Sequence, residues 1–133
     1  MNSDQDLIDQ IDDLFHPRSV AVVGAPRGMK TGAVFLTALL EQGFPGPIYP
    51  VNPQAEEISG IKAYPKVAAI PGPVDLAIIL VPHWNSIPVV KECAVKGVKG
   101  AVLFTAGYKE TGTAEGKALE EELLRVAGEA GMR

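Results

Sequence analysis

Residues 19–32, with the sequence SVAVVGAPRGMKTG, restrict the fold of this chain more than any other stretch. The continuous apolar run VAVV is typical of a strand that is buried on both faces of a parallel sheet. The run ends at Gly24, a short loop follows, and helical spacing begins at about Thr31. The free N–H groups and the positive dipole end of such a helix attract an anion into the turn. We therefore predict a strand, a turn with an anion site and a helix, although a plain connection that binds nothing has the same pattern.

The composition restricts the size and the partners of the protein. A chain of 133 residues with 47% apolar residues can bury one hydrophobic core, so we expect one domain. The net charge of −4 and the lack of a basic stripe exclude a nucleic-acid surface. One cysteine, Cys93, allows no internal disulfide and is typical of a reducing compartment. No apolar run reaches membrane-spanning length, and the acidic N-terminus is unlike a signal sequence, so we expect a cytoplasmic protein without membrane contact.

Strand and helix patterns alternate along the chain. Each predicted strand is an apolar run that is bounded by proline or glycine. The predicted strands are residues 19–24, 48–51, 74–81 and 98–105, with a small extended piece at 61–63. Each predicted helix has apolar positions three and four residues apart. The predicted helices are residues 1–15, about 31–42, 86–96 and about 114–130, with a single helical turn at 66–70.

This alternation predicts an α/β fold, because parallel strands need crossover connections over the faces of their sheet. We expect a Rossmann-like, doubly wound parallel sheet in three α/β/α layers, with strand order 3-2-1-4 for the four strands counted along the chain. In this architecture a fifth parallel strand would follow the last helix, where the chain stops at Arg133. We therefore expect a fragment of a longer protein, with residues 1–16 as a helical lead-in and 17–133 as the domain. A natural C-terminus is the alternative.

Ligands of such sheets bind above the carboxyl ends of the strands, so the four loops that follow the strands should converge on one cleft. In the first loop, Arg27 and Lys30 are cations that can hold phosphate, although solvated loop charges have the same pattern. The candidate binding residues are Gly24, Ala25, Pro26, Arg27, Gly28 and Lys30 in the first loop, Val51, Asn52 and Pro53 in the second, Val81 and Pro82 in the third, and Thr105, Ala106 and Gly107 in the fourth.

A nicotinamide dinucleotide suits these loops poorly. Gly24, Gly28 and Gly32 are spaced four and four, and this spacing differs from the G-x-G-x-x-G fingerprint. The second strand ends in Asn52 and Pro53, at a place where a dinucleotide site has an acidic residue for the ribose. The sequence therefore favours a phosphate-rich ligand over NAD(H).

No side chain has the sequence neighbours of a catalytic group. His16 and His83 each stand alone, His83 at the mouth of the expected cleft with Trp84 beside it. Asp75 opens a strand without an evident partner. Cys93 lies in the middle of a helix, where a packed thiol is more common than a nucleophile. Metal-ligand spacing is absent as well. We therefore expect a binding module without a catalytic residue or a metal site.

Four motifs carry a resemblance to a known family. They are LFHPRSVAVVGAPR at residues 14–27, GFPGPIYPVNPQAEEISGIKAYP at 43–65, PVDLAIILVP at 73–82 and GVKGAVLFTAGYKETG at 97–112. In this order they resemble the N-terminal CoA-binding domain of NDP-forming acyl-CoA synthetases. That group includes ADP-forming acetyl-CoA synthetase and is similar to the alpha subunit of succinyl-CoA synthetase. Pro26 departs from the commoner pattern, in which Ser follows Gly-Ala.

The resemblance implies that coenzyme A lies across the carboxyl ends of the strands. The first loop would bind phosphates, the second and third would line the nucleotide and pantetheine path, and the fourth would approach the reactive end. The parent enzyme would be an acid–thiol ligase that makes acyl-CoA through a phosphohistidine in a later domain and an ATP-grasp domain. This chain alone is then expected to be inactive. A stand-alone CoA-binding or regulatory module and the CoA-binding domain of a protein acetyltransferase are the alternatives.

Overall fold

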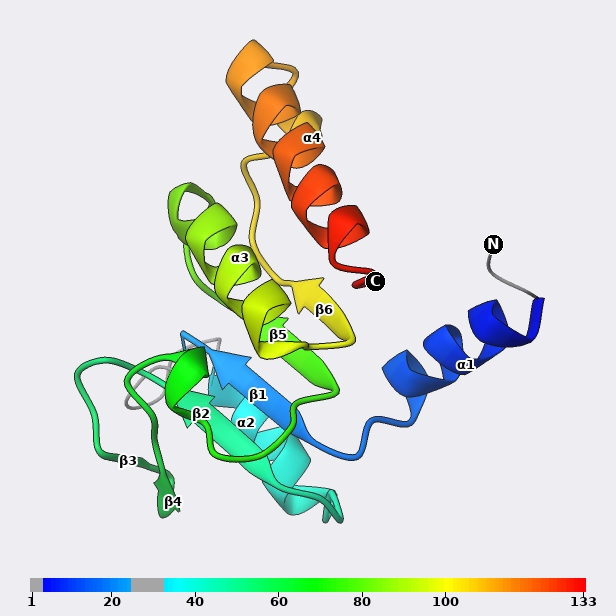
Figure 1. Ribbon diagram of the computed structural model, residues 1–133. Helices are drawn as coiled ribbons and strands as arrows, with labels where there is room; N and C mark the ends of the chain where they lie inside the picture. Colours follow the sequence, from blue (N-terminus) through cyan, green and yellow to red (C-terminus); the bar gives the residue numbers. More distant parts are fainter. Residues whose placement is uncertain (1–3, 25–32) are drawn as a thin grey trace.

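A four-stranded parallel sheet forms the centre of the molecule (Figure 1). The computed structural model describes residues 4–24 and 33–133. Within these residues, the strands run in the spatial order β2-β1-β5-β6. Their bounds are β1 (Val20–Val23), β2 (Ile48–Val51), β5 (Leu76–Ile79) and β6 (Gly100–Leu103). The α/β fold with a parallel sheet that the sequence predicts is confirmed.

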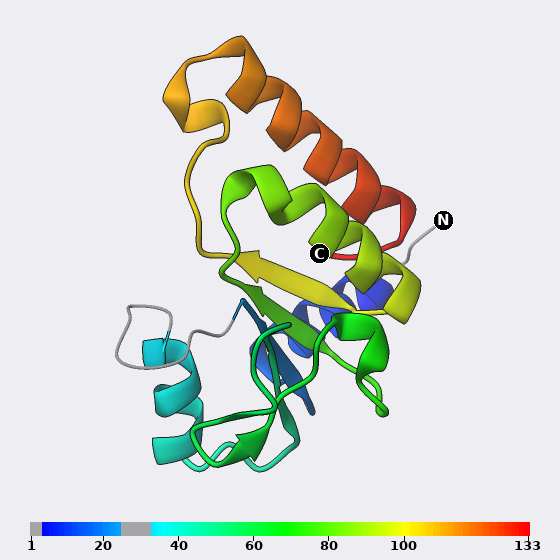
Figure 2. The same ribbon diagram turned by 90° about the vertical axis from the view of Figure 1, so that its left-hand side faces the viewer.

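Helices cover the two faces of this sheet (Figure 2). Helix α2 lies on one face, and α3 and α4 lie together on the other. A short antiparallel hairpin of β3 and β4 joins the α2 side. The bounds of these elements are α2 (Ala33–Glu41), α3 (Ser86–Lys96), α4 (Ala114–Glu129), β3 (Glu57–Ile58) and β4 (Ile61–Lys62). The three predicted layers are therefore present, with single turns at η1 (Val67–Ala69), η2 (His83–Asn85) and η3 (Lys109–Thr111).

The alternation of side chains along β1 divides the core into two parts. Val20 and Val22 pack with Leu36 of α2, whereas Ala21 and Val23 pack in the cluster that α3 and α4 cover. All four β1 residues are buried, as expected for a strand enclosed by helices on both sides. β1 lies in the middle of the sheet, so the first loop begins between the ends of β2 and β5.

The predicted strand order 3-2-1-4 is wrong. The third predicted strand, residues 74–81, contains β5, and β5 lies beside β1 and not beside β2. The place beyond β2 belongs to Tyr64, which forms a single parallel bridge to Val51. Two main-chain hydrogen bonds hold this bridge, from Tyr64 to Pro50 and from Asn52 to Tyr64. The strand position beyond β2 is thus reduced to one bridge, which is too short to leave a recognisable apolar run in the sequence. The chain then returns through η1, and β5 takes the place on the other side of β1.

The free edge of the sheet is at β6, where Arg133 begins to pair. The Arg133 N–H donates to Lys99 O at 3.1 Å, and Ala101 N–H donates to Arg133 O at 2.7 Å. This is the pattern of a parallel ladder. Met132, just before it, is buried. Past Ala101, no described residue pairs with this edge of β6.

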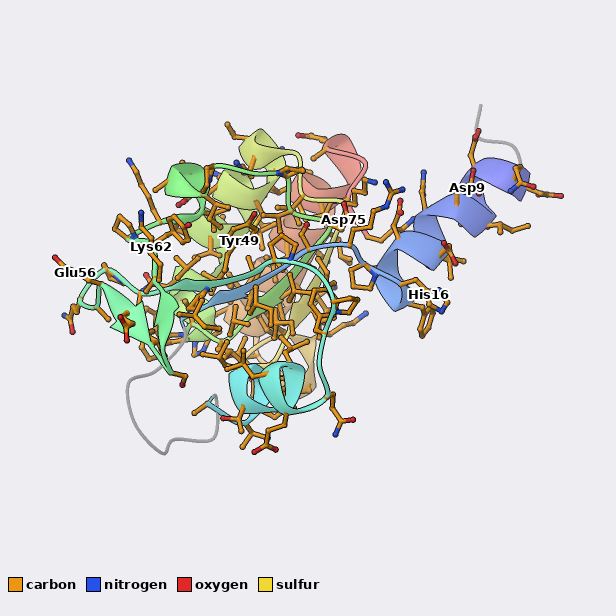
Figure 3. All side chains as sticks on the ribbon, turned by 90° about the horizontal axis from the view of Figure 1, so that it is seen from below. Asp9, His16, Tyr49, Glu56, Lys62 and Asp75 are labelled. Atoms are coloured by element: carbon orange, nitrogen blue, oxygen red, sulfur yellow. The ribbon has the colours of Figure 1, made fainter. Side chains whose placement is uncertain are left out.

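Helix α1 (Asp4–Phe15) projects from the body of the molecule (Figure 3). The helix that the apolar spacing predicts is present, but none of its residues is buried. It contacts the β6 edge of the sheet, where Leu14 lies so close to Gly100 that a Cβ at Gly100 would overlap the leucine side chain, and Gln10 accepts a hydrogen bond from Arg133 Nε at 2.8 Å. Asp13 also lies 3.6 Å from Lys99 in an ion pair. In the described part of the chain, no helix has the length and apolar character needed to cross a membrane.

Candidate functional site

The carboxyl ends of β1, β2 and β5 come together at Gly24. Its N–H donates to Val51 O at 3.0 Å, and Leu80 N–H donates to Val23 O at 2.8 Å. Gly24 has φ +85°, a conformation that glycine adopts without strain. A Cβ at Gly24 would lie 3.1 Å from the Val81 side chain and 3.2 Å from the Val81 nitrogen. Because Gly24 has no side chain, the chain can leave β1 directly against the end of β5.

The end of β2 forms a tight turn. The Asn52 side-chain oxygen accepts a hydrogen bond from Gln54 N–H at 2.7 Å, which fixes an Asx turn. The turn borders an open depression of about 840 Å³ between the loop that follows β2 and the β3–β4 hairpin, a volume within the usual range for small-molecule sites. Glu56 and Lys62 lie at this end of the molecule, remote from α1 (Figure 3). The depression is lined by Pro53, Gln54, Ala55, Glu56, Glu57, Lys62, Ala63 and Pro65.

The ends of β5 and β6 are in contact through His83 and Gly107. Phe104 N–H donates to Ile79 O at 2.9 Å, which extends the ladder past β6. Gly107 then lies against the imidazole, since a Cβ at this position would overlap the His83 ring. In the same loop, Thr105 is half-buried and Ala106 is exposed. Figure 2 shows the strands pointing toward one edge of the sheet, where these loops follow.

A carboxylate holds the β6 loop from the other side. Glu110 Oε1 accepts hydrogen bonds from Gly107 N–H at 2.6 Å and from Tyr108 N–H at 3.1 Å. These two hydrogen bonds hold the pKa of Glu110 below its ordinary value, and the bond from Gly107 has the larger effect. The neighbouring His83 acts in the same direction with a smaller effect. Glu110 is therefore ionised at neutral pH and bound to the main chain of the loop.

Tyr108 anchors the loop in the core. Burial raises the pKa of its phenol above the ordinary value. Among the described residues the phenol oxygen of Tyr108 has no hydrogen-bond partner, and the Ser86 hydroxyl donates to His83 O at 2.6 Å instead. Ser86 thus fixes the main chain that carries His83, while Tyr108 fixes the main chain that carries Gly107.

Of the predicted binding residues, those at the four strand ends lie along one edge of the sheet. Ala25, Pro26, Arg27, Gly28 and Lys30 are outside the described residues. The described members are Gly24, Val51, Asn52, Pro53, Val81, Pro82, Thr105, Ala106 and Gly107.

The side chains considered for catalysis lie elsewhere or have structural partners. His16 is exposed on the far side with α1, where its Nδ1 is 3.0 Å from Asp12. Asp75, for which the sequence suggested no partner, accepts a hydrogen bond from Arg18 N–H at 2.9 Å and lies 3.5 Å from Lys99. Cys93 is fully buried, and this burial raises the pKa of its thiol to about 12. A thiol with this pKa is not a nucleophile at neutral pH.

Comparison with known proteins assigns the chain to a family. A family model described as CoA binding domain matches residues 18–133. The chain belongs to the CoA binding domain family. The ADP-forming acetate–CoA ligase II of Archaeoglobus fulgidus is 45% identical to this CoA binding domain over 127 residues. This alignment covers 95% of the domain and 19% of the ligase, so the chain spans about a fifth of that relative.

Two solved structures resemble this CoA binding domain. One is the dinucleotide forming acetyl-coenzyme A synthetase 1 of Ca. Korarchaeum cryptofilum in complex with phosphate and ADP, with TM-score 0.87 and 46% identity. The match covers 92% of the domain and 26% of the synthetase chain. The other is a conserved hypothetical protein from Pyrococcus furiosus, with TM-score 0.66 and 31% identity, over 86% of the domain and 88% of that chain.

Sequence reasoning missed Glu110, Ser86 and Tyr108 in this CoA binding domain. The motif GYKETG contained a signal for Glu110, because a carboxylate three residues after a glycine can return to the N–H groups of the turn. The contact of Tyr108 with the region of Ser86 had no such signal, since the two residues belong to different strand–helix units. The hydrogen bonds of Glu110 are local, whereas the position of Tyr108 depends on how the units pack.

Proposed function

We propose that the chain binds coenzyme A across the carboxyl ends of β1, β2, β5 and β6. The observation that carries the proposal is the convergence of these ends in a chain whose family is described as CoA binding domain. Gly24, which has no side chain, lets the chain leave β1 against Val81, so that the first loop begins at the edge where the strand ends converge. Arg27 and Lys30 are our candidates for the charged contacts to its phosphates.

We further propose that the chain is the N-terminal domain of an NDP-forming acyl-CoA synthetase. The similarity to the Archaeoglobus ligase and to the Korarchaeum synthetase supports this parent enzyme. The parent would make acyl-CoA from acid, CoA and nucleoside triphosphate, with its remaining domains or a partner subunit supplying the phosphohistidine and the nucleotide site. The parent enzyme is expected in the cytoplasm. A fifth parallel strand after Arg133 belongs to the same proposal, and it is supported by the pairing of Arg133 with β6.

A second candidate function is a stand-alone CoA-binding or regulatory module. The observation in its favour is the Pyrococcus furiosus protein, because the match covers 88% of that chain and leaves little room for further domains there. The two candidates share the same ligand and differ in what accompanies the domain. The sequence of the complete gene product after Arg133 decides between them, and it also identifies a transferase domain if the parent is a protein acetyltransferase.

Calorimetry with CoA, dephospho-CoA and NADH on the same sample tests the proposal. We expect CoA to bind and NADH to bind poorly, because Asn52 stands where a dinucleotide site needs an acid for the ribose. Tighter binding of NADH than of CoA would place the chain among the dinucleotide-binding domains instead. The chain should form no acyl-CoA from acid, CoA and ATP, and turnover that disappears in His83→Ala would show that chemistry takes place in this domain.

A further inference from the structure

The loop after β6 is held by a side chain that returns to its own main chain. The Glu110 carboxylate accepts from two successive N–H groups, those of Gly107 and Tyr108, through one oxygen. No other hydrogen bond of these two N–H groups occurs among the described residues. A bond from an N–H group to an ionised carboxylate is shorter and stronger than one to a neutral oxygen. Glu110 therefore holds this turn more firmly than a neutral side chain would.

The turn is confined on its other side by the end of β5. The His83 ring occupies the space that a side chain at Gly107 would need. Ser86 fixes the carbonyl group of His83, and the hydroxyl of Thr111 donates to Tyr108 O at 2.7 Å. Gly107 therefore lies between the His83 imidazole, which follows β5, and the Glu110 carboxylate, which follows β6. Its φ of +120° lies where only glycine is at ease, so the turn depends on contacts that hold it.

We propose that Glu110 is a positioning residue for ligand binding at the β6 end. Its carboxylate fixes the main chain at Gly107 and Tyr108 against His83 and so presets the end of the loop that carries Thr105 and Ala106. Preorganisation of this kind raises affinity because the loop does not lose conformational freedom when the ligand arrives. The inference rests on the proposed function, since Thr105, Ala106 and Gly107 are the fourth group of proposed CoA contacts.

The test compares Glu110→Ala, Glu110→Gln and the control Glu115→Gln. Glu115 is exposed at the start of α4 and has no ion pair or side-chain hydrogen bond among the described residues. We expect Glu110→Ala to weaken CoA binding by about threefold to tenfold. This effect is smaller than that of a buried carboxylate, because water can reach Glu110. Glu110→Gln should recover part of this loss, because its amide oxygen still accepts from the two N–H groups. The control should bind as the unaltered chain does.

Amide NMR spectra separate positioning from general destabilisation. In Glu110→Gln, the N–H signals of Gly107 and Tyr108 should move, while the midpoint of thermal unfolding stays at the value of the control. Unchanged CoA affinity in Glu110→Ala, or unmoved Gly107 and Tyr108 signals, would overturn the inference. If the unaltered chain binds no CoA, the proposed function fails and the ligand role of Glu110 fails with it. In that case, shifted amide signals of Gly107 and Tyr108 would still show that Glu110 holds the loop.

Discussion

The buried carboxylate of Asp75 accepts a hydrogen bond from the main-chain N–H of Arg18 at 2.9 Å, across 57 residues of sequence. Asp75 precedes β5, and Arg18 precedes β1, so the bond joins the amino ends of two neighbouring strands. Ser19 completes the junction, since its hydroxyl donates to Pro73 O and accepts from Asp75 N–H. This junction sets the register of the two strands at the end opposite the candidate site.

Asp75→Ala should lower the free energy of unfolding by about 1–3 kcal/mol, because the part-buried Arg18 N–H loses its charged acceptor. Urea denaturation measures this change. Lys99→Met is the control, since it removes the ion pairs of Lys99 with Asp75 and Asp13 but leaves the hydrogen bond. Lys99 is 46% exposed, so its loss should cost less than about 1 kcal/mol. Equal losses in the two variants would show that the ion pair, and not the hydrogen bond, stabilises the junction.

Gly107→Ala should destabilise the fold more than Gly112→Ala. Both glycines have positive φ, which costs an alanine about 1–2 kcal/mol. The Cβ of Gly112→Ala meets nothing within 4 Å, whereas that of Gly107→Ala must displace the His83 ring. Displacement of a packed side chain adds about 1–3 kcal/mol, so we expect a total of about 2–5 kcal/mol for Gly107→Ala. The double variant with His83→Ala should regain part of the loss in thermal unfolding, and no regain would contradict the contact.

The burial of the Cys93 thiol should make the folded chain less stable at alkaline pH. The folded-state pKa of its thiol is about 12, above the ordinary value of 9.0, because burial disfavours the thiolate. The stabilisation is complete below pH 9 and is lost as the pH rises toward 12, at up to about 1.4 kcal/mol per pH unit. Urea denaturation between pH 8 and pH 11 should show a shallower decline in Cys93→Ala, in spite of its lower starting stability. Rapid thiol labelling of the native chain at pH 8 would contradict this burial.

Arg27→Ala should weaken CoA binding by about one to two decades, because a charge-assisted hydrogen bond contributes roughly 1.5–3 kcal/mol. Arg27 lies outside the described residues, so the ligand series locates its contact. A smaller loss with dephospho-CoA than with CoA indicates the 3′-phosphate, and an equal loss indicates the pyrophosphate. Calorimetry measures both. Unchanged CoA affinity in Arg27→Ala would mean that this cation is a solvated loop charge.

Local sequence patterns were sufficient to predict the four strands of the parallel sheet and the four α-helices. The VAVV run predicted a strand buried on both faces, because each of its residues has an apolar side chain that needs cover. Gly43 and Gly97 predicted helix ends, and both adopt positive φ within two residues of the ends of α2 and α3. The four strand-end loops followed in turn from the rule that ligands bind at the carboxyl edge of a parallel sheet.

Contacts between distant residues determined the rest. The order of the strands depended on Tyr64, a single bridge residue that no periodicity marks. The partners of Asp75 and the packing of Gly107 on His83 depended on main-chain groups that approach from other units of the fold. A hydrogen bond between neighbours in sequence leaves a recognisable spacing, because the chain itself fixes the geometry. A bond across 57 residues leaves none, because folding of the whole sheet brings its two ends together.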